Sequence, residues 1–127
     1  MERLIETVAS DHIRVNCDPA NLVIWPSLLA MRRGERYDRE SALEHYQPVA
    51  GARVLGPYVV HTHAKDAIVR DDGKYQEVSL GTGWIDWPQY LKNLHDAGYR
   101  GYFAIEREVG DDPVGDVRRA VNFLRSL

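Results

Sequence analysis

The fold prediction starts from the stretch Tyr58-Val59-Val60-His61-Thr62-His63-Ala64-Lys65-Asp66. Its β-favouring residues predict a buried strand. Because side chains alternate along a strand, His61, His63 and Lys65 share one face of it. Of the two histidines, one can equally be a hydrogen-bonded core residue and the other a surface group. The functional interpretation therefore depends on what the neighbouring strands contribute.

A second strand is predicted at residues 12–18, where His-Ile-Arg-Val-Asn-Cys-Asp alternates polar and apolar side chains. Its polar face includes Arg14, a charge low on the inward face. Pro19 has no N–H for a ladder and restricts the preceding residue to an extended conformation. This strand is therefore expected to end with the Asp18 carboxylate at its C-terminal tip.

A third short strand is predicted at residues 101–106, Gly-Tyr-Phe-Ala-Ile-Glu. It also ends in a carboxylate, Glu106, and Glu108 falls on the same face. Three strands thus end in Asp18, His63 and Glu106, residue types that bind metals.

Helices are predicted around these strands. Residues 1–10 have helical spacing, and residues 38–54 form a helical stretch that Pro48 is placed to break. Asp86 is a good N-cap for a helix that stops at Gly98, and Asp112 caps the last helix. The resulting alternation of helix and strand predicts an α/β fold of parallel βα units.

The segment Ala67–Gly83 is predicted as a long connection with a turn at Asp71-Asp72-Gly73. Near its end, Gly81-Thr82-Gly83 lacks the third glycine and the Lys-Ser/Thr ending of nucleotide-binding loops. We therefore expect these glycines to serve backbone geometry and not to cradle a phosphate.

Composition limits the class of protein. The chain has 127 residues, 44% hydrophobic and 28% charged, and a formal charge of −3, which predicts one domain over residues 1–127. Interleaved charges provide no basic stripe, so nucleic acid is disfavoured as a partner. One cysteine, Cys17, and the absence of a signal-like or membrane-length apolar run favour a cytoplasmic location without membrane partners.

Three metal-type ligands at corresponding strand ends predict a metal site, because parallel α/β folds place active sites there. Each residue also has a structural interpretation. Asp18 could cap the following helix, His63 could be a buried hydrogen-bonded imidazole, and Glu106 could pair with Arg107 or Lys65. Their joint occurrence favours a divalent ion such as manganese, magnesium, cobalt or zinc.

Four segments in this order resemble the C-terminal part of the xylose isomerase-like TIM barrels, the sugar phosphate isomerase/epimerase group. They are Asn16-Cys17-Asp18-Pro19-Ala20-Asn21, His61-Thr62-His63-Ala64-Lys65-Asp66, Ser79-Leu80-Gly81-Thr82-Gly83 and Ile105-Glu106-Arg107-Glu108.

The resemblance implies that Asp18, His63 and Glu106 are three of four ligands to one divalent metal. It also implies that Glu106 is one of two carboxylates that move a proton next to the carbonyl of a sugar or inositol-like substrate. Lys65 is expected to steady an enediolate. The residues expected to contact the substrate are Asn21, His61, Trp25 and Trp84, with both tryptophans in loops that wall a pocket.

The sequence departs from this family in several ways. The fourth ligand, a glutamate on the preceding strand, is absent, and Thr82 stands where many relatives carry an acidic residue. Complete barrels have roughly 250 residues, so the chain corresponds to about the last three strands of a (β/α)8 barrel. A three-stranded parallel sheet exposes two edges, which predicts a homo-oligomer or a missing N-terminal barrel half as partner.

Two alternatives follow. The chain could be a catalytically incomplete fragment or interaction module that keeps the fold without activity. A DNA-repair relative similar to endonuclease IV, with three zinc ions, is less favoured. That branch has a histidine where this chain has Asn21, and an Asp-x-His motif where it has residues 75–78.

Overall fold

The computed structural model describes all residues from 1 to 127. In chain order the elements are α1 (Glu2–Val8), β1 (Val15–Cys17), α2 (Pro19–Arg33), α3 (Arg39–His45), α4 (Pro48–Leu55), a 3₁₀ turn η1 (Gly56–Tyr58), β2 (Val59–Ala64), β3 (Asp66–Val69), β4 (Tyr75–Val78), α5 (Trp87–Asp96), β5 (Phe103–Ile105) and α6 (Pro113–Arg125).

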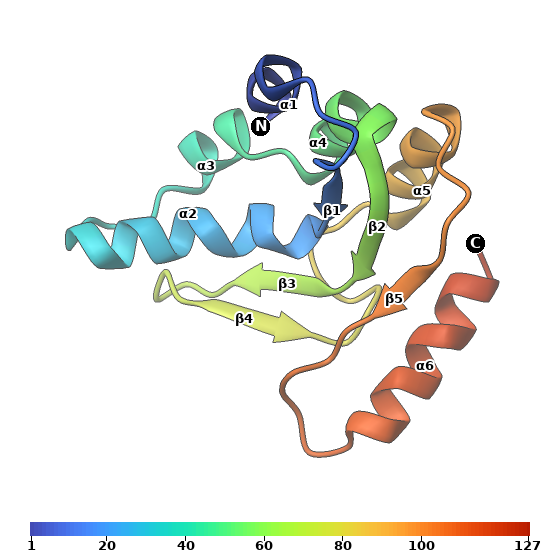
Figure 1. Cartoon of the computed structure of the whole chain (residues 1–127). Coiled ribbons are helices and arrows are strands. Elements are labelled where there is room, and N and C mark those ends of the chain that lie inside the picture. The colour runs from blue at the N-terminus through green and yellow to red at the C-terminus, as the bar shows by residue number, and fades with distance from the viewer.

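The three predicted strands form one parallel sheet in the order β1-β2-β5, which confirms the α/β class (Figure 1). Because all three strands point the same way, their C-terminal ends lie at one edge of the sheet. The first strand is shorter than the predicted 12–18, and Arg14 lies outside it, exposed and paired with Asp11. Val15 pairs with Val59 and Asn16 pairs with His61, so Val60 of β2 is an extra residue without a partner in β1.

The prediction of a long connection from Ala67 to Gly83 was wrong, because most of this segment is an antiparallel hairpin of β3 and β4. Its turn contains Gly73 with φ 79°, a left-handed conformation that favours glycine. An Asp-Gly turn between two β-favouring runs is itself a hairpin signal. The hairpin leaves the C-terminal end of β2 and runs beneath α2 (Figure 1).

The helix boundaries follow the predicted caps. Asp18, Asp86 and Asp112 each accept a hydrogen bond from a backbone N–H in the first turn of α2, α5 and α6. Pro48 breaks the predicted 38–54 helix into α3 and α4. None of the helices has the length and apolar character needed to cross a bilayer.

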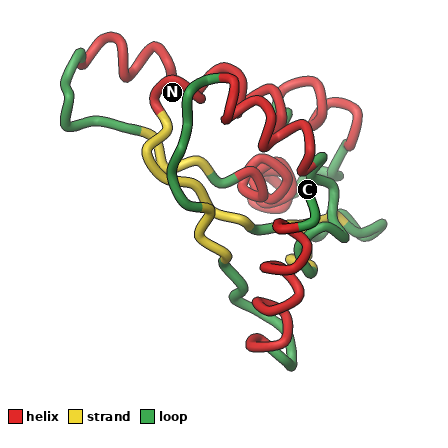
Figure 2. The backbone as a smooth tube through the Cα atoms, turned by 90° about the vertical axis from the view of Figure 1, so that its right-hand side faces the viewer, coloured by secondary structure: helices red, strands yellow, loops and turns green.

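Helices cover one face of the parallel sheet. Thr62 on β2 is fully buried, and its hydroxyl lies 2.8 Å from the hydroxyl of Tyr90 on α5. By contrast, Asn16 and His61 are exposed, although they lie on the first and central strands. Figure 2 shows most of the helices on one side of the strands. The sheet therefore presents an open polar face that leads to its C-terminal edge.

Candidate metal centre

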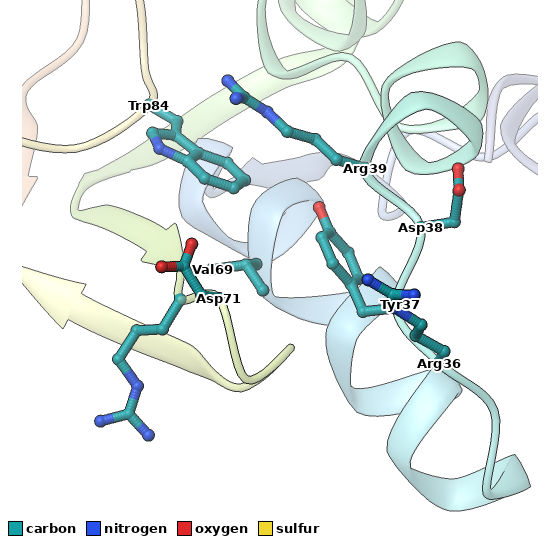
Figure 3. A pocket seen from close by; sticks show the side chains of 8 residues that line it. Arg36, Tyr37, Asp38, Arg39, Val69, Asp71 and Trp84 are labelled. Carbon is teal, nitrogen blue, oxygen red and sulfur yellow. The ribbon is translucent and has the colours of Figure 1, made fainter.

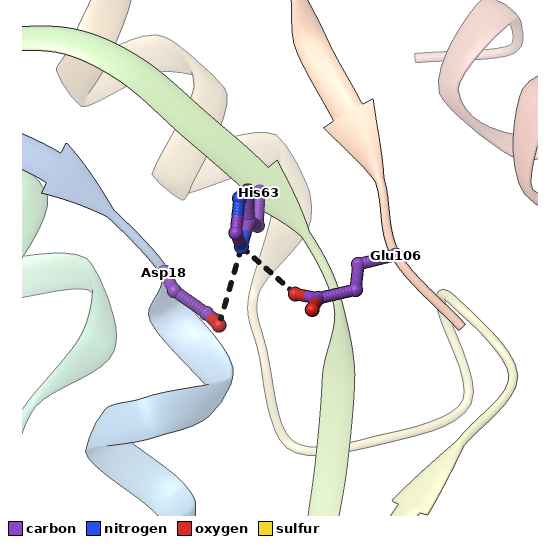
Figure 4. A group of neighbouring side chains, drawn as sticks. All are labelled: Asp18, His63 and Glu106. Atoms are coloured by element: carbon purple, nitrogen blue, oxygen red, sulfur yellow. Dashed lines mark ion pairs between the residues drawn. The ribbon is translucent and has the colours of Figure 1, made fainter. Parts of the chain in front are cut away.

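Asp18, His63 and Glu106 converge at the C-terminal edge of the sheet (Figure 4). One potential ligand atom from each lies within 4.8 Å of the other two. The three residues follow or end β1, β2 and β5, so the parallel register brings together positions that are 43 or more residues apart in the chain. No other group of three His, Cys, Asp or Glu side chains converges in this way.

Local structure orients each of these side chains. Asp18 caps α2 by accepting a hydrogen bond from Ala20 N at 2.9 Å through Oδ1, which leaves Oδ2 3.8 Å from His63 Nδ1. The same His63 Nδ1 lies 2.8 Å from Glu106 Oε2. On the other side of the ring, Nε2 is 3.5 Å from the Asn16 amide nitrogen. The imidazole is therefore held with Nδ1 facing both carboxylates.

The structural interpretations explain part of this arrangement. Asp18 is indeed a helix cap, and His63 does contact Glu106. Neither role requires all three side chains to face one point. Burial raises the pKa of Asp18 despite the hydrogen bond from Ala20, so its negative charge is incompletely compensated. Two carboxylates and an imidazole form a donor set that fits a divalent cation.

Lys65 follows β2 and is almost fully buried among three carboxylates. Its ammonium group contacts Glu108 and lies 3.5 Å from Glu106 Oε2 and 3.6 Å from Glu77 Oε2. Burial opposes the charged form, but the hydrogen bond to Glu108 and the nearby negative charges outweigh it and raise the pKa of Lys65. Lys65 therefore stays protonated and anchors the segment that carries Glu106.

Glu77 is a site residue that the sequence reasoning missed, because the hairpin containing β4 was not predicted. Its Oε1 accepts hydrogen bonds from Arg107 and from the backbone N–H of Glu108, both at 3.0 Å. Arg107 also donates to Asp116 on α6 at 2.8 Å. This ionic network fixes the chain immediately after Glu106 to both the hairpin and the last helix.

Asp66 provides a second structural anchor beside the cluster. Its carboxylate is buried without a cation partner and accepts hydrogen bonds from five N–H groups. Two of the donors are Gly81 and Gly83. A Cβ on Gly83 would lie 2.0 Å from Asp66 Oδ1, which accounts for that glycine. The Gly-Thr-Gly segment thus serves backbone geometry, as predicted.

The expected substrate contacts occupy different places. His61 packs edge-to-face on His63, with ring centroids 5.3 Å apart. Asn21 and Trp25 are exposed on α2, three and seven residues after Asp18, on the helix face that continues from it. Trp25 was predicted in a loop and lies instead within a helix. Trp84 is in a loop, but lines a separate cavity beside Arg39.

Comparisons with known proteins agree with this architecture. The family model described as "Xylose isomerase-like TIM barrel" matches residues 1–127. An Escherichia coli protein named "Putative L-ribulose-5-phosphate 3-epimerase SgbU" is 27% identical over 125 residues, covering 95% of this chain and 37% of that protein.

A solved structure, the xylose isomerase domain protein from Planctomyces limnophilus, superposes with a TM-score of 0.73 at 30% identity, covering 98% of this chain. The chain covers 40% of that structure. It therefore spans about two fifths of the length of both relatives, and its fold corresponds to part of a TIM barrel.

Proposed function

Because this chain belongs to the xylose isomerase-like TIM barrel family, we propose that it provides the metal-binding part of a sugar isomerase or epimerase. The observation that supports this most directly is the convergence of Asp18, His63 and Glu106 from three strands on one point. The substrate class proposed is a small sugar, sugar phosphate or inositol-like molecule with a carbonyl group.

The proposed cofactor is one divalent cation, held by Asp18, by His63 through Nδ1 and by Glu106. Manganese, magnesium, cobalt and zinc are all compatible with this mixed oxygen and nitrogen donor set. When bound, such an ion polarises carbonyl and hydroxyl oxygens and so acidifies the adjacent C–H bond. Three protein ligands leave positions for a fourth protein ligand, for water or for substrate.

In this proposal Glu106 also carries the proton that is removed from one substrate carbon and returned to it or to its neighbour. A positioned acid or base contributes roughly two to four orders of magnitude to such a rate. Lys65 lies 3.5 Å from the Glu106 carboxylate. It is a positioning residue that orients this carboxylate, and its charge also favours negative charge developing on a substrate oxygen.

The open face of the sheet gives the substrate access to the cluster. His61 is exposed beside His63, and Asn21 and Trp25 extend the same side along α2. We propose that these three residues contact the sugar, with the Trp25 ring supplying an apolar surface. Trp84, in its separate cavity, is not included in this substrate site.

A second function is favoured by one specific observation. The cluster supplies three ligands, and the sheet has an open face and two unpaired edges. A chain of this kind could act as an interaction module that keeps the fold but lacks turnover when studied alone. In that case a metal would bind weakly, and the chain would bind other chains without converting a substrate.

Metal titration tests the proposal. We expect calorimetric titration with Mn²⁺ to show binding to the metal-free chain, and His63→Ala to abolish it. His95→Ala is the matched control, because His95 is exposed on α5 and faces only Asp96. Unchanged Mn²⁺ binding by the His63 variant would contradict the site assignment.

Turnover then separates the two functions. We expect little activity from the chain alone on a panel of ketoses and their epimers with added Mn²⁺. Activity should appear when a separately made N-terminal portion of a related barrel is added, and Glu106→Gln should remove it. Metal binding without activity, both for the chain alone and with the N-terminal portion added, would favour the interaction module.

A further inference from the structure

A cavity of about 520 Å³ lies between the β3–β4 hairpin and the segment that joins α2 to α3 (Figure 3). Its size is that of a pocket for a small metabolite. Residues 36–39 form one wall, residues 69–71 form another, and Trp84 closes one end. These segments are far apart in the sequence, and the fold of the β3–β4 hairpin brings residues 69–71 to residues 36–39.

This cavity is separate from the metal centre. The hairpin turn is held against the middle of α2 by a hydrogen bond from the Ser27 hydroxyl to Gly73 O. Ser27 is nine residues after Asp18, or about 14 Å along a helix that rises 1.5 Å per residue. The cavity also shares no lining residue with the Asp18, His63 and Glu106 cluster.

Two arginines supply uncompensated positive charge to the cavity. Neither Arg36 nor Arg39 has a carboxylate within ion-pair distance, whereas Arg70, on the same rim, pairs with Asp72 at 3.0 Å. The Arg39 guanidinium lies 4.4 Å from the centroid of the Trp84 ring. This cation–π contact fixes the position of the guanidinium without neutralising it, so both arginines remain able to bind an anion.

The cavity also contains two groups that can accept hydrogen bonds from a ligand, the Asp71 carboxylate and the Tyr37 hydroxyl. The Asp71 carboxylate has no protein partner and points toward Trp84 in Figure 3. The Tyr37 hydroxyl also faces the cavity and makes no hydrogen bond within the chain. Asp38 differs, because its carboxylate caps α3 through the N–H of Ser41. Val69 and the two aromatic rings complete an apolar wall.

We propose that this cavity is a second binding site, for a phosphorylated sugar or polyol. The phosphate would be bound by Arg39, since guanidinium groups match phosphate geometry. Arg36, on the other side of Tyr37 in Figure 3, would attract it at longer range. The hydroxyls of the ligand would donate to Asp71 and bond with Tyr37. The site is independent of the proposed catalytic function, because none of its residues belongs to the metal cluster.

Calorimetric titration of the metal-free chain with ribose 5-phosphate, ribose and inorganic phosphate tests this proposal. Ribose 5-phosphate should bind most tightly, because only it satisfies both the arginines and the hydroxyl acceptors. Arg39→Gln should weaken its binding roughly tenfold, the usual effect of a lost hydrogen bond to a charged group, and Arg36→Gln should weaken it less. Arg53→Gln is the matched control and should change the affinity less than twofold, because Arg53 is exposed on α4 and does not line the cavity.

Two further variants make the result specific. Asp71→Asn should weaken ribose 5-phosphate binding and leave phosphate binding unchanged, whereas His63→Ala should leave both unchanged. In a ¹⁵N-labelled chain, the indole resonance of Trp84 should shift on titration, and that of Trp25 should not. No binding, equal loss in the Arg53 and Arg39 variants, or loss in the His63 variant would overturn the proposal.

Discussion

At the scale of single residues, Asp66 shows how a buried charge is held beside the site. Its Oδ2 accepts hydrogen bonds from Gly81, Gly83 and the Trp87 indole at 3.0 to 3.1 Å. Its Oδ1 accepts from Ala67 and, at 3.4 Å, from Ile85. Burial still raises the pKa of Asp66, although these donors favour the ionised form. Five N–H groups replace the cation that most buried carboxylates require.

Asp66→Asn should therefore destabilise the chain despite its small change in shape. An amide has one acceptor oxygen, so its NH₂ group would face at least two of the present donors. We expect a loss of about 2 to 4 kcal/mol in the free energy of unfolding, measured by urea denaturation. The control is Asp86→Asn, an exposed helix cap where Asn and Asp are nearly equivalent. Equal stability of the two variants would contradict this account.

The metal-type residues could be predicted because their signals are local. The alternation of side chains placed His63 on the polar face of its strand. Because Pro19 cannot continue a strand, Asp18 was expected at the strand's C-terminal end. The partners of Lys65 could not be predicted in the same way, because Glu77 reaches it only through the pairing of β3 with β4. Long-range pairing of this kind leaves no periodic pattern at the residue concerned.

At the scale of elements, the hairpin is the part of the fold that connects the two candidate sites. Its β4 strand provides Glu77 to the Lys65 and Arg107 network, and its turn forms one wall of the cavity. The local signals for this hairpin, an Asp-Gly turn between two β-favouring runs, were present in the sequence. Residues 67–83 were nevertheless predicted as a loop. An antiparallel hairpin is not expected between parallel strands, which are usually connected by helices.

Glu77→Gln tests whether the hairpin supports the metal site. The change removes the charge that faces Lys65 and Arg107 and weakens the bond that holds the backbone of Glu108. Glu106 should then be held less firmly, and we expect Mn²⁺ affinity to fall roughly tenfold, the effect of losing one hydrogen bond to a charged group. Gln76→Ala, one residue earlier and exposed, should leave the affinity unchanged. An unaltered affinity in the Glu77 variant would limit this residue to a structural role.

At the scale of the whole molecule, the parallel sheet lacks the cover that such sheets normally have. Parallel sheets are usually buried on both faces, yet here Val60 in the central strand is 60% exposed. The outer edges of β1 and β5 have no paired strand, and Tyr102, just before β5, is 90% exposed. Unpaired edges and apolar surface of this kind promote association between chains.

We therefore expect the chain, when studied alone, to self-associate. Light scattering after size-exclusion chromatography should give a mass above the 14.5 kDa of one chain, increasing with concentration. Val60→Lys should shift the equilibrium toward the monomer, because a charge on exposed sheet surface opposes the burial that association requires. Leu127→Lys is the control, since that residue is exposed at the end of the chain outside the sheet. A monomer at every concentration, with cooperative unfolding, would mean that the open face and edges are stable in water.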